Sequence, residues 1–383
     1  MASYSMPSPA LPSPDSNAER PVPPVEDRPA WVVPCPDLDA ATQRFESAGF
    51  SLLAIGPADD PRWALMSNGH GRYVTSFRLD TSAYLDGHRH PFLEVDGHDP
   101  LLGPSDTGAV PDFVAARPGP LATDPVHVDP PGPTEPGTAT PAGWVVGRAG
   151  MRYRDLLPGR WGGQFIASHI HIPDGGPVPD YVHYHHVDFQ LIFCHRGWVR
   201  VVYQDQGDPF VLEPGDAILQ APGLRHRVLE ASDNLHVVEV SSPAEHATFV
   251  EHDLELPNGV EPGRWYGGQR YVHHRAADTP WSATGAGVRV QSLGLEPATS
   301  GRYAACVIEL EIVDGAELEL PVADSVDFEF VAVLDGSLVV TETKGGEEAL
   351  FGEGSALSLD DGVAWTARPG ERSRILVVSR HRT

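Results

Sequence analysis

The stretch YVHYHHVDFQ (residues 181–190) places three histidines and a glutamine between two apolar runs. His183 and His185 are two positions apart, so on a β-strand both side chains point to the same face. His186 has the wrong parity to join them. His183 and His185 are ligands only if a further group joins them from elsewhere in the chain, and otherwise they belong to an ordinary polar strand.

That further group is His226, which ends the segment GDAILQAPGLRH (215–226). The spacing His183-x-His185-x4-Gln190, followed by this segment, resembles the two sequence motifs of the cupin superfamily. The resemblance implies a jelly-roll barrel in which His183, His185, Gln190 and His226 bind a metal. Gln190 stands where the family usually has a glutamate.

Gln190 changes the expected chemistry of the site. A carboxamide oxygen is a neutral ligand, so the metal keeps its full charge and favours an anionic substrate such as an enolate, phenolate or carboxylate. Gln190 could equally hydrogen-bond a bound water or the substrate, and that alternative stays open. We expect one divalent transition metal, with Fe(II) first and Mn, Ni, Co or Zn as alternatives, because nitrogen and oxygen ligands suit all of them.

From about residue 160, short apolar runs alternate with Gly, Pro and Asp turns, which is typical of an all-β fold. A shift of 139 residues places the triplet 187–189 on 326–328 and Gln190 on Glu329, and aligns several glycines. Such an internal repeat predicts two domains of one architecture. We therefore predict a mainly β fold with two tandem cupin jelly-roll barrels, the second degenerate, and a small α+β N-terminal module.

The second copy lacks the proposed ligands. Val322, Asp324 and Trp365 stand where the first copy has His183, His185 and His226, and Glu329 alone could still ligate. The second barrel should therefore hold no equivalent metal, and we expect it to cover a face of the first.

The same shift suggests two catalytic candidates, His169 and His171. It aligns them with Ile308 and Leu310, which belong to the apolar side of an alternating strand. If that side faces inward in both copies, His169 and His171 point into the metal pocket, where a histidine could serve as general acid–base.

Outside the repeat, the segment 30–93 reads as strand, helix and three strands, and resembles one half-module of the glyoxalase-like vicinal-oxygen-chelate superfamily. Two flanking segments are too rich in proline for regular structure. The predicted organisation is a disordered tail (1–29), the glyoxalase-like half-module (30–93), a Pro/Gly-rich linker (94–143), the metal-binding barrel (144–258) and the ligand-free barrel (259–383).

Composition bounds the function. The formal net charge of −26 argues against nucleic acid or an anionic membrane as partner. The N-terminal residues lack a signal-peptide pattern, and no apolar run is long enough to span a membrane, so we expect a cytoplasmic protein. The expected partner is a small-molecule substrate, and the oligomeric state is left open with a homodimer as one alternative.

Three hypotheses follow for the activity. The first is a metal-dependent dioxygenase acting on a small anionic substrate. The second is a non-redox cupin enzyme (isomerase, cyclase, lyase or decarboxylase) that uses the metal as a Lewis acid. The third is a small-molecule-binding protein without turnover. Fold analogy alone does not choose among them.

Overall fold

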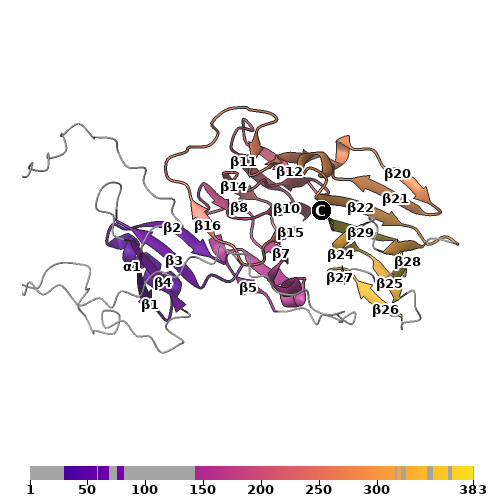
Figure 1. The fold of residues 1–383 in the computed structure, drawn as a ribbon, viewed down its shortest axis with the longest axis horizontal. Helices are drawn as coiled ribbons and strands as arrows, with labels where there is room; N and C mark the ends of the chain where they lie inside the picture. Colours follow the sequence, from indigo (N-terminus) through magenta and orange to yellow (C-terminus); the bar gives the residue numbers. More distant parts are fainter. Residues whose placement is uncertain are drawn as a thin grey trace, which may run out of the picture.

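The computed structural model describes residues 30–57, 59–68, 76–81, 143–314, 317–320, 325–342, 348–360 and 365–382. The predicted tail, nearly all of the predicted linker, and the positions Val322 and Asp324 lie outside these described residues. Figure 1 shows an N-terminal module followed by two β-structured bodies in chain order along the long axis. Within the described ranges, no helix is long and apolar enough to cross a membrane.

The N-terminal module has the predicted order of strand, helix and three strands. Its elements are β1 (Trp31–Pro34), α1 (Leu38–Ser47), β2 (Ser51–Gly56), β3 (Trp63–Ser67) and β4 (Ser76–Asp80). Asp37 caps the helix, because its side chain accepts a hydrogen bond of 2.9 Å from the Ala40 N–H. β1 pairs in parallel with β4, so the sheet order is β1-β4-β3-β2. The resemblance to a glyoxalase-like half-module stays a prediction.

The first barrel is built from two facing sheets. Its strands are β5 (Val145–Val146), β6 (Arg152–Asp155), β7 (Ile166–Ile172), β8 (Gly176–Pro177), β9 (His183–His185), β10 (Phe189–Arg196), β11 (Val199–Tyr203), β12 (Phe210–Leu212), β13 (Ala217–Leu219), β14 (His226–Ala231), β15 (Leu235–Ser242) and β16 (Thr248–Val250). One sheet has the order β16-β9-β14-β11-β12, and the other β13-β10-β15-β7-β6-β5. Short 3-10 turns lie at Arg148–Gly150 and Pro158–Gly163.

Both ends of this barrel are tied to neighbouring segments. β2 of the N-terminal module pairs with β16, so the two parts share one sheet. After the barrel, β17 (Trp265–Tyr266) pairs with β18 (Gln269–Arg270), and β19 (Val272–His274) then pairs with β13. A strand beyond residue 258 therefore extends a sheet of the first barrel.

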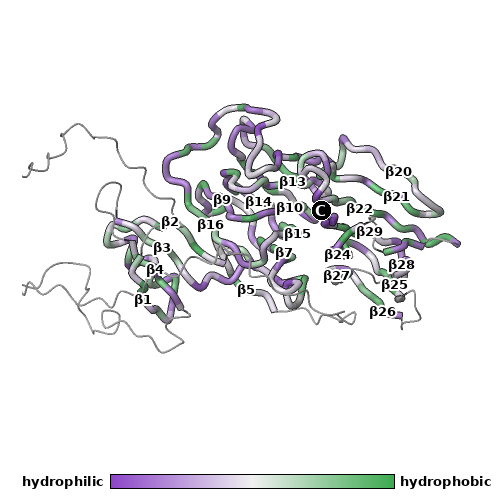
Figure 2. The backbone as a smooth tube through the Cα atoms, viewed as in Figure 1, coloured by the Kyte–Doolittle hydropathy of each residue, from purple (hydrophilic) through white to green (hydrophobic). Residues whose placement is uncertain are grey.

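The second barrel repeats the design. Its strands are β20 (Ser282–Gly285), β21 (Val288–Ser292), β22 (Tyr303–Leu310), β23 (Leu318–Leu320), β24 (Val326–Asp335), β25 (Ser337–Glu342), β26 (Ala349–Gly352), β27 (Ala356–Asp360), β28 (Trp365–Pro369) and β29 (Ser373–His381), with 3-10 turns at Ala276–Asp278 and Glu296–Ala298. They form the sheets β20-β21-β22-β29-β24-β27 and β23-β28-β25-β26. The predicted mainly β fold with two tandem jelly-roll barrels is confirmed. Figure 2 shows hydrophobic and hydrophilic residues alternating along the strands of both.

The largest apolar cluster lies between the barrels and has near-twofold symmetry. Phe165 of the first barrel stacks on Phe328 of the second at 3.9 Å between ring centroids, and Phe189 of the first stacks on Tyr303 of the second at 4.1 Å. The repeat relates Phe189 to Phe328, and Phe165 to Tyr303, so each contact is the image of the other. All four rings are at most 1 % exposed. Each barrel therefore covers an apolar face of the other, as two subunits do in an isologous dimer.

Candidate metal centre

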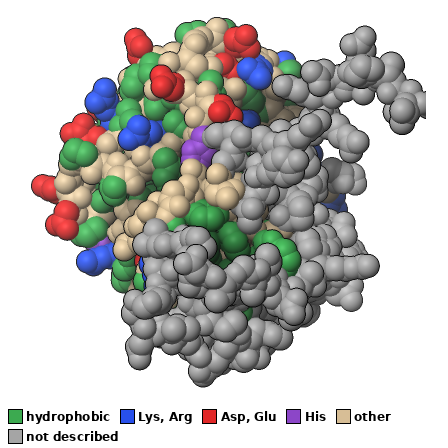
Figure 3. Space-filling view, turned by 90° about the vertical axis from the view of Figure 1, so that its left-hand side faces the viewer, with side chains coloured by type: hydrophobic (Ala, Val, Ile, Leu, Met, Phe, Trp, Pro, Cys, Tyr) green, Lys and Arg blue, Asp and Glu red, His purple; other side chains and the backbone are tan. Residues whose placement is uncertain are grey.

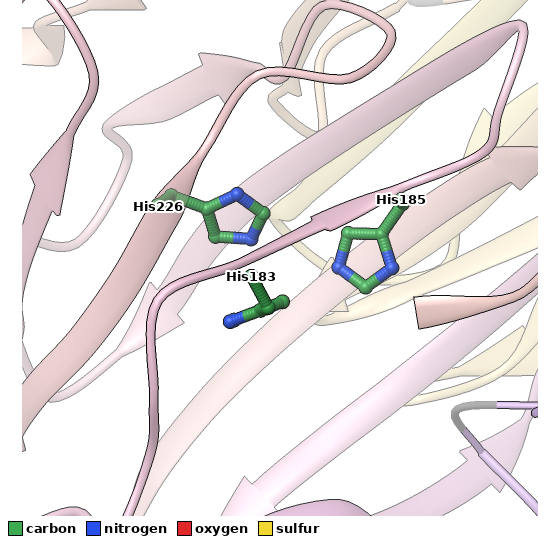
Figure 4. A group of neighbouring side chains, drawn as sticks. All are labelled: His183, His185 and His226. Carbon is green, nitrogen blue, oxygen red and sulfur yellow. The ribbon is translucent and has the colours of Figure 1, made fainter. Parts of the chain in front are cut away.

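Three histidines meet on two paired strands of the first barrel. His183 and His185 lie on β9, and His226 opens the neighbouring strand β14, where it pairs directly with His183. All three side chains are buried, and one ligand nitrogen from each lies within 4.8 Å of the others. Figure 4 shows the three rings close together. Tyr184, between the two β9 histidines, instead stacks on Phe249, as the alternation of a strand requires.

Hydrogen bonds hold each ring through its Nδ1 atom. His183 Nδ1 is 2.8 Å from the Tyr181 carbonyl oxygen, and His226 Nδ1 is 2.9 Å from the Leu224 carbonyl oxygen. A carbonyl only accepts, so both rings carry their proton on Nδ1 and their lone pair on Nε2. His185 Nδ1 is 3.1 Å from Thr248 Oγ1. Outer hydrogen bonds of this kind orient histidines for metal binding.

Gln190, on β10, lines the same cavity and is 1 % exposed. Its Nε2 donates a hydrogen bond of 2.8 Å to Oε1 of Glu239 on β15. A carboxylate accepts but does not donate, so the NH₂ group must face Glu239, and the amide oxygen faces away from it. This orientation leaves an oxygen for a metal or a substrate, and ligation by Gln190 stays a prediction.

Glu239 is a cavity residue that the sequence analysis missed. It lies in the run LHVVEVSS (235–242), where Val237, Glu239 and Ser241 share one face of the strand. Ser241 Oγ donates to Oε1 of Glu239 at 3.0 Å, so that oxygen accepts two hydrogen bonds. The sequence did offer a signal for it, namely a single acidic residue within an apolar strand. Such a side chain points either to solvent or into a polar site.

The cavity beside the triad measures about 80 Å³. Part of its lining is polar, and the other walls are aliphatic side chains and two tyrosines. The polar lining residues are His183, His185, His226, Gln190, Gln220 and Glu239. Among the described residues that line the cavity, none is a lysine or an arginine. Tyr203 donates to Gln220, and burial raises the pKa of its phenol, so the hydroxyl stays protonated.

His169 and His171 do not line the cavity, so the prediction that they point into the metal pocket is wrong. Ile170 and Ile172 of β7 line it instead. His169 Nδ1 lies 2.9 Å from Arg154 Nη2, and its Nε2 lies 2.8 Å from Nδ1 of His236. Trp144 covers both histidines, at 5.1 and 5.5 Å between ring centroids.

A one-residue slip in the repeat explains this error. The strand registers relate Leu191 to Phe330, 139 positions later, because both sit at the same place in their sheets. Ala167 and Ala305, however, pair with equivalent residues of β15 and β29 at a separation of 138. On β7 the structural partner of Ile308 is therefore Ile170, and a shift by one residue exchanges the two faces of a strand.

Two largely buried histidines outside the cavity, His169 on β7 and His195 on β10, predict that the fold loses stability in acid. Burial lowers the pKa of His169 from 6.5 to about 3, and Arg154 lowers it further. Burial also lowers the pKa of His195 to about 4, although Asp335 opposes this shift. The folded protein holds both rings in the neutral form, whereas the unfolded chain protonates them below about pH 6.5. Their contribution to folding stability is therefore present above pH 6.5 and is lost as the pH falls toward 4.

We expect the free energy of unfolding to fall by about 3 kcal/mol between pH 6.5 and 5 through these two groups together. Each group contributes up to about 1.4 kcal/mol per pH unit, and the slope reaches that value only below pH 6.5, where the unfolded rings become fully protonated. Urea unfolding at both pH values measures this. His195→Asn, which cannot be protonated, should lose about half of the fall. An unchanged pH dependence in that variant would contradict the assignment.

Comparisons with known proteins find distant matches among solved structures. No family model matches the chain, and no curated protein sequence matches it significantly. Among solved structures, oxalate decarboxylase of Lactobacillus farciminis in a formate complex has 12% identity, covers 63% of this chain and 84% of its own, and has a TM-score of 0.48. A salicylate 1,2-dioxygenase variant of Pseudoaminobacter salicylatoxidans has 17% identity, covers 57% of this chain and 70% of its own, and has a TM-score of 0.41. A Bacillus subtilis oxalate decarboxylase variant has 13% identity, covers 60% of this chain and 73% of its own, and has a TM-score of 0.46. We therefore assign the architecture of this chain from its own strand pairing and not from these matches.

Proposed function

We propose that this chain is a cupin-type metalloenzyme whose divalent transition metal is held by His183, His185 and His226, with Gln190 as a fourth ligand. The carrying observation is that three buried histidines converge beside a largely apolar cavity. The set fits a metal, because three neutral imidazole nitrogens and an amide oxygen are ligands for first-row transition metals. Fe(II) is our first choice, followed by Mn, Ni, Co or Zn.

The favoured activity is a dioxygenase reaction on a small anionic substrate, an enolate, phenolate or carboxylate. When bound, the metal would supply charge stabilisation and redox chemistry beside the three histidines. The chain itself would exclude water with its aliphatic walls and orient the three histidines through their Nδ1 hydrogen bonds. Gln190, fixed by Glu239, would present its amide oxygen.

A non-redox isomerase, cyclase, lyase or decarboxylase is the second candidate. Glu239 favours it, because a carboxylate inside the cavity can accept a proton while the metal acts as a Lewis acid. His169 and His171, which face away from the cavity, take no part in this proposal.

The domain roles follow from the same assignment. We propose that the barrel of residues 144–258 holds the metal, and that residues 259–383, with Trp365 in the place of His226, act as its structural cover. Figure 3 shows acidic and basic side chains interspersed over the described part of one face, without a concentrated basic patch there. A cytoplasmic location and a homodimer remain proposals.

Metal analysis and oxygen uptake together test the proposed function. Purified protein should contain about one transition metal per chain. With small enolates, phenolates and carboxylates as substrates, an oxygen electrode should record uptake that stops when a chelator removes the metal. Turnover without oxygen uptake would favour the non-redox candidate. Metal without turnover of any compound would favour the binding protein, and absence of metal after reconstitution would overturn the proposal.

A further inference from the structure

The charge of the cavity limits what it can accept. Glu239 is the single acidic side chain among the described lining residues, and no lysine or arginine stands beside it. An anionic group of a substrate therefore finds a positive partner at the proposed metal alone. A second anionic group would lie in a low-dielectric space without a counter-charge, which is strongly unfavourable.

The remaining walls suit a hydrocarbon body. They are formed by aliphatic side chains of several strands of the first barrel, among them Ile170, Ile172, Ile192, Val199, Leu212 and Val237. Burial of apolar ligand surface against such walls is favourable in proportion to the area removed from water. A molecule with an apolar body gains affinity there, whereas a compact, wholly polar anion gains none.

Glu239 sits where it can act on the substrate's charge. Its Oε1 accepts hydrogen bonds from Gln190 Nε2 and Ser241 Oγ, so the carboxylate is anchored beside a proposed metal ligand. Like charges repel more strongly inside a protein than in water, because the effective dielectric constant is lower. The carboxylate therefore disfavours a second negative charge near the metal.

The second barrel carries its buried carboxylate on a different strand from the first. There the buried acid is Glu329 of β24, at the place of Gln190, and Ser379 of β29 donates to it at 2.8 Å. Val377 takes the place of Glu239, because each pairs with the equivalent residue of the neighbouring strand. In the first barrel the amide occupies the motif position, and the acid lies on β15.

We propose that the site accepts a monoanionic molecule that chelates through two oxygens and carries an apolar body, and that Glu239 is the specificity-determining residue that excludes dianions. This inference rests on the proposed metal centre. Exclusion by an uncompensated charge is a direct route to specificity.

Titration of the metal-loaded protein with two chelating probes tests the inference. Tropolone is a monoanionic O,O-chelator with an apolar ring, and oxalate is a dianionic O,O-chelator without an apolar body. Isothermal calorimetry at pH 8, with metal content measured before and after, should give at least about tenfold tighter binding of tropolone. Oxalate binding as tightly as tropolone would overturn the inference while leaving the metal centre intact.

Variants at Glu239 separate charge from shape. Glu239→Gln keeps an oxygen that accepts from Gln190 but removes the charge. It should lower the ratio of tropolone affinity to oxalate affinity about tenfold. Glu239→Val, the residue found in the second barrel, should do the same if the glutamine variant folds poorly. Ser241→Ala, which leaves the charge in place, is the matched control and should preserve the preference within about twofold.

The outcomes distinguish the two levels of the proposal. A metal-loaded parent whose preference is unchanged by both Glu239 variants refutes the role of Glu239 alone. Failure of the parent to hold any metal refutes the proposed function, and the inference with it.

Discussion

His183→Ala is expected to lower the metal content from about one ion per chain to less than about a tenth of that. His183 is fully buried, and its ring lies 5.1 Å from that of His185 and 4.2 Å from that of His226, between centroids. Alanine removes the shared neighbour of the other two ligands and leaves a space that water can enter. Elemental analysis after dialysis against a weak chelator measures the loss.

His186→Ala is the matched control for this experiment. His186 follows His185 directly but is exposed, and its ring packs beside Phe249 rather than in the cavity. The control should keep its metal, and its apo-form should unfold at nearly the temperature of the apo-parent. The apo-form of His183→Ala should still unfold cooperatively, at a lower temperature because a buried side chain is lost. Equal metal loss in the two variants would show that the ligands are not the inward residues of β9.

The sequence predicted the triad because its signal is local. His183 and His185 are separated by one residue on a short strand, and the segment that ends in His226 has turn residues at fixed positions. Such spacing determines the facing of side chains without knowledge of any distant contact. The helix predicted within the segment 30–93 was found for the same reason, since α1 has its own local pattern.

Features that depend on how distant strands pair could not be predicted from such local patterns. A constant shift between the repeats gives no sign of the one-residue slip before β9, and one residue is enough to turn His169 away from the cavity. Glu239 approaches Gln190 only because β15 pairs with β10 in a register that the sequence does not reveal. The pairing of β2 with β16 joins segments almost 200 residues apart, with no local pattern to indicate it.

Removal of the second barrel is expected to abolish cooperative folding. A chain that ends at Thr279, after β19, keeps every strand of the first barrel but loses the partners of Phe165 and Phe189. Both rings are completely buried in the intact chain. Their exposure, together with the rest of the apolar face, should produce insoluble protein or a compact state that binds a hydrophobic dye and unfolds without a sharp transition.

Phe328→Ala in the full-length chain is the control that separates loss of one contact from loss of the whole cover. It should lower the free energy of unfolding by about 3–5 kcal/mol in urea, because a fully buried aromatic side chain leaves a cavity. The fold and the metal content should survive, since Phe328 lies across the barrel interface and does not line the cavity at the triad. A soluble, monomeric truncated chain that unfolds cooperatively and holds one metal would show that the first barrel needs no cover.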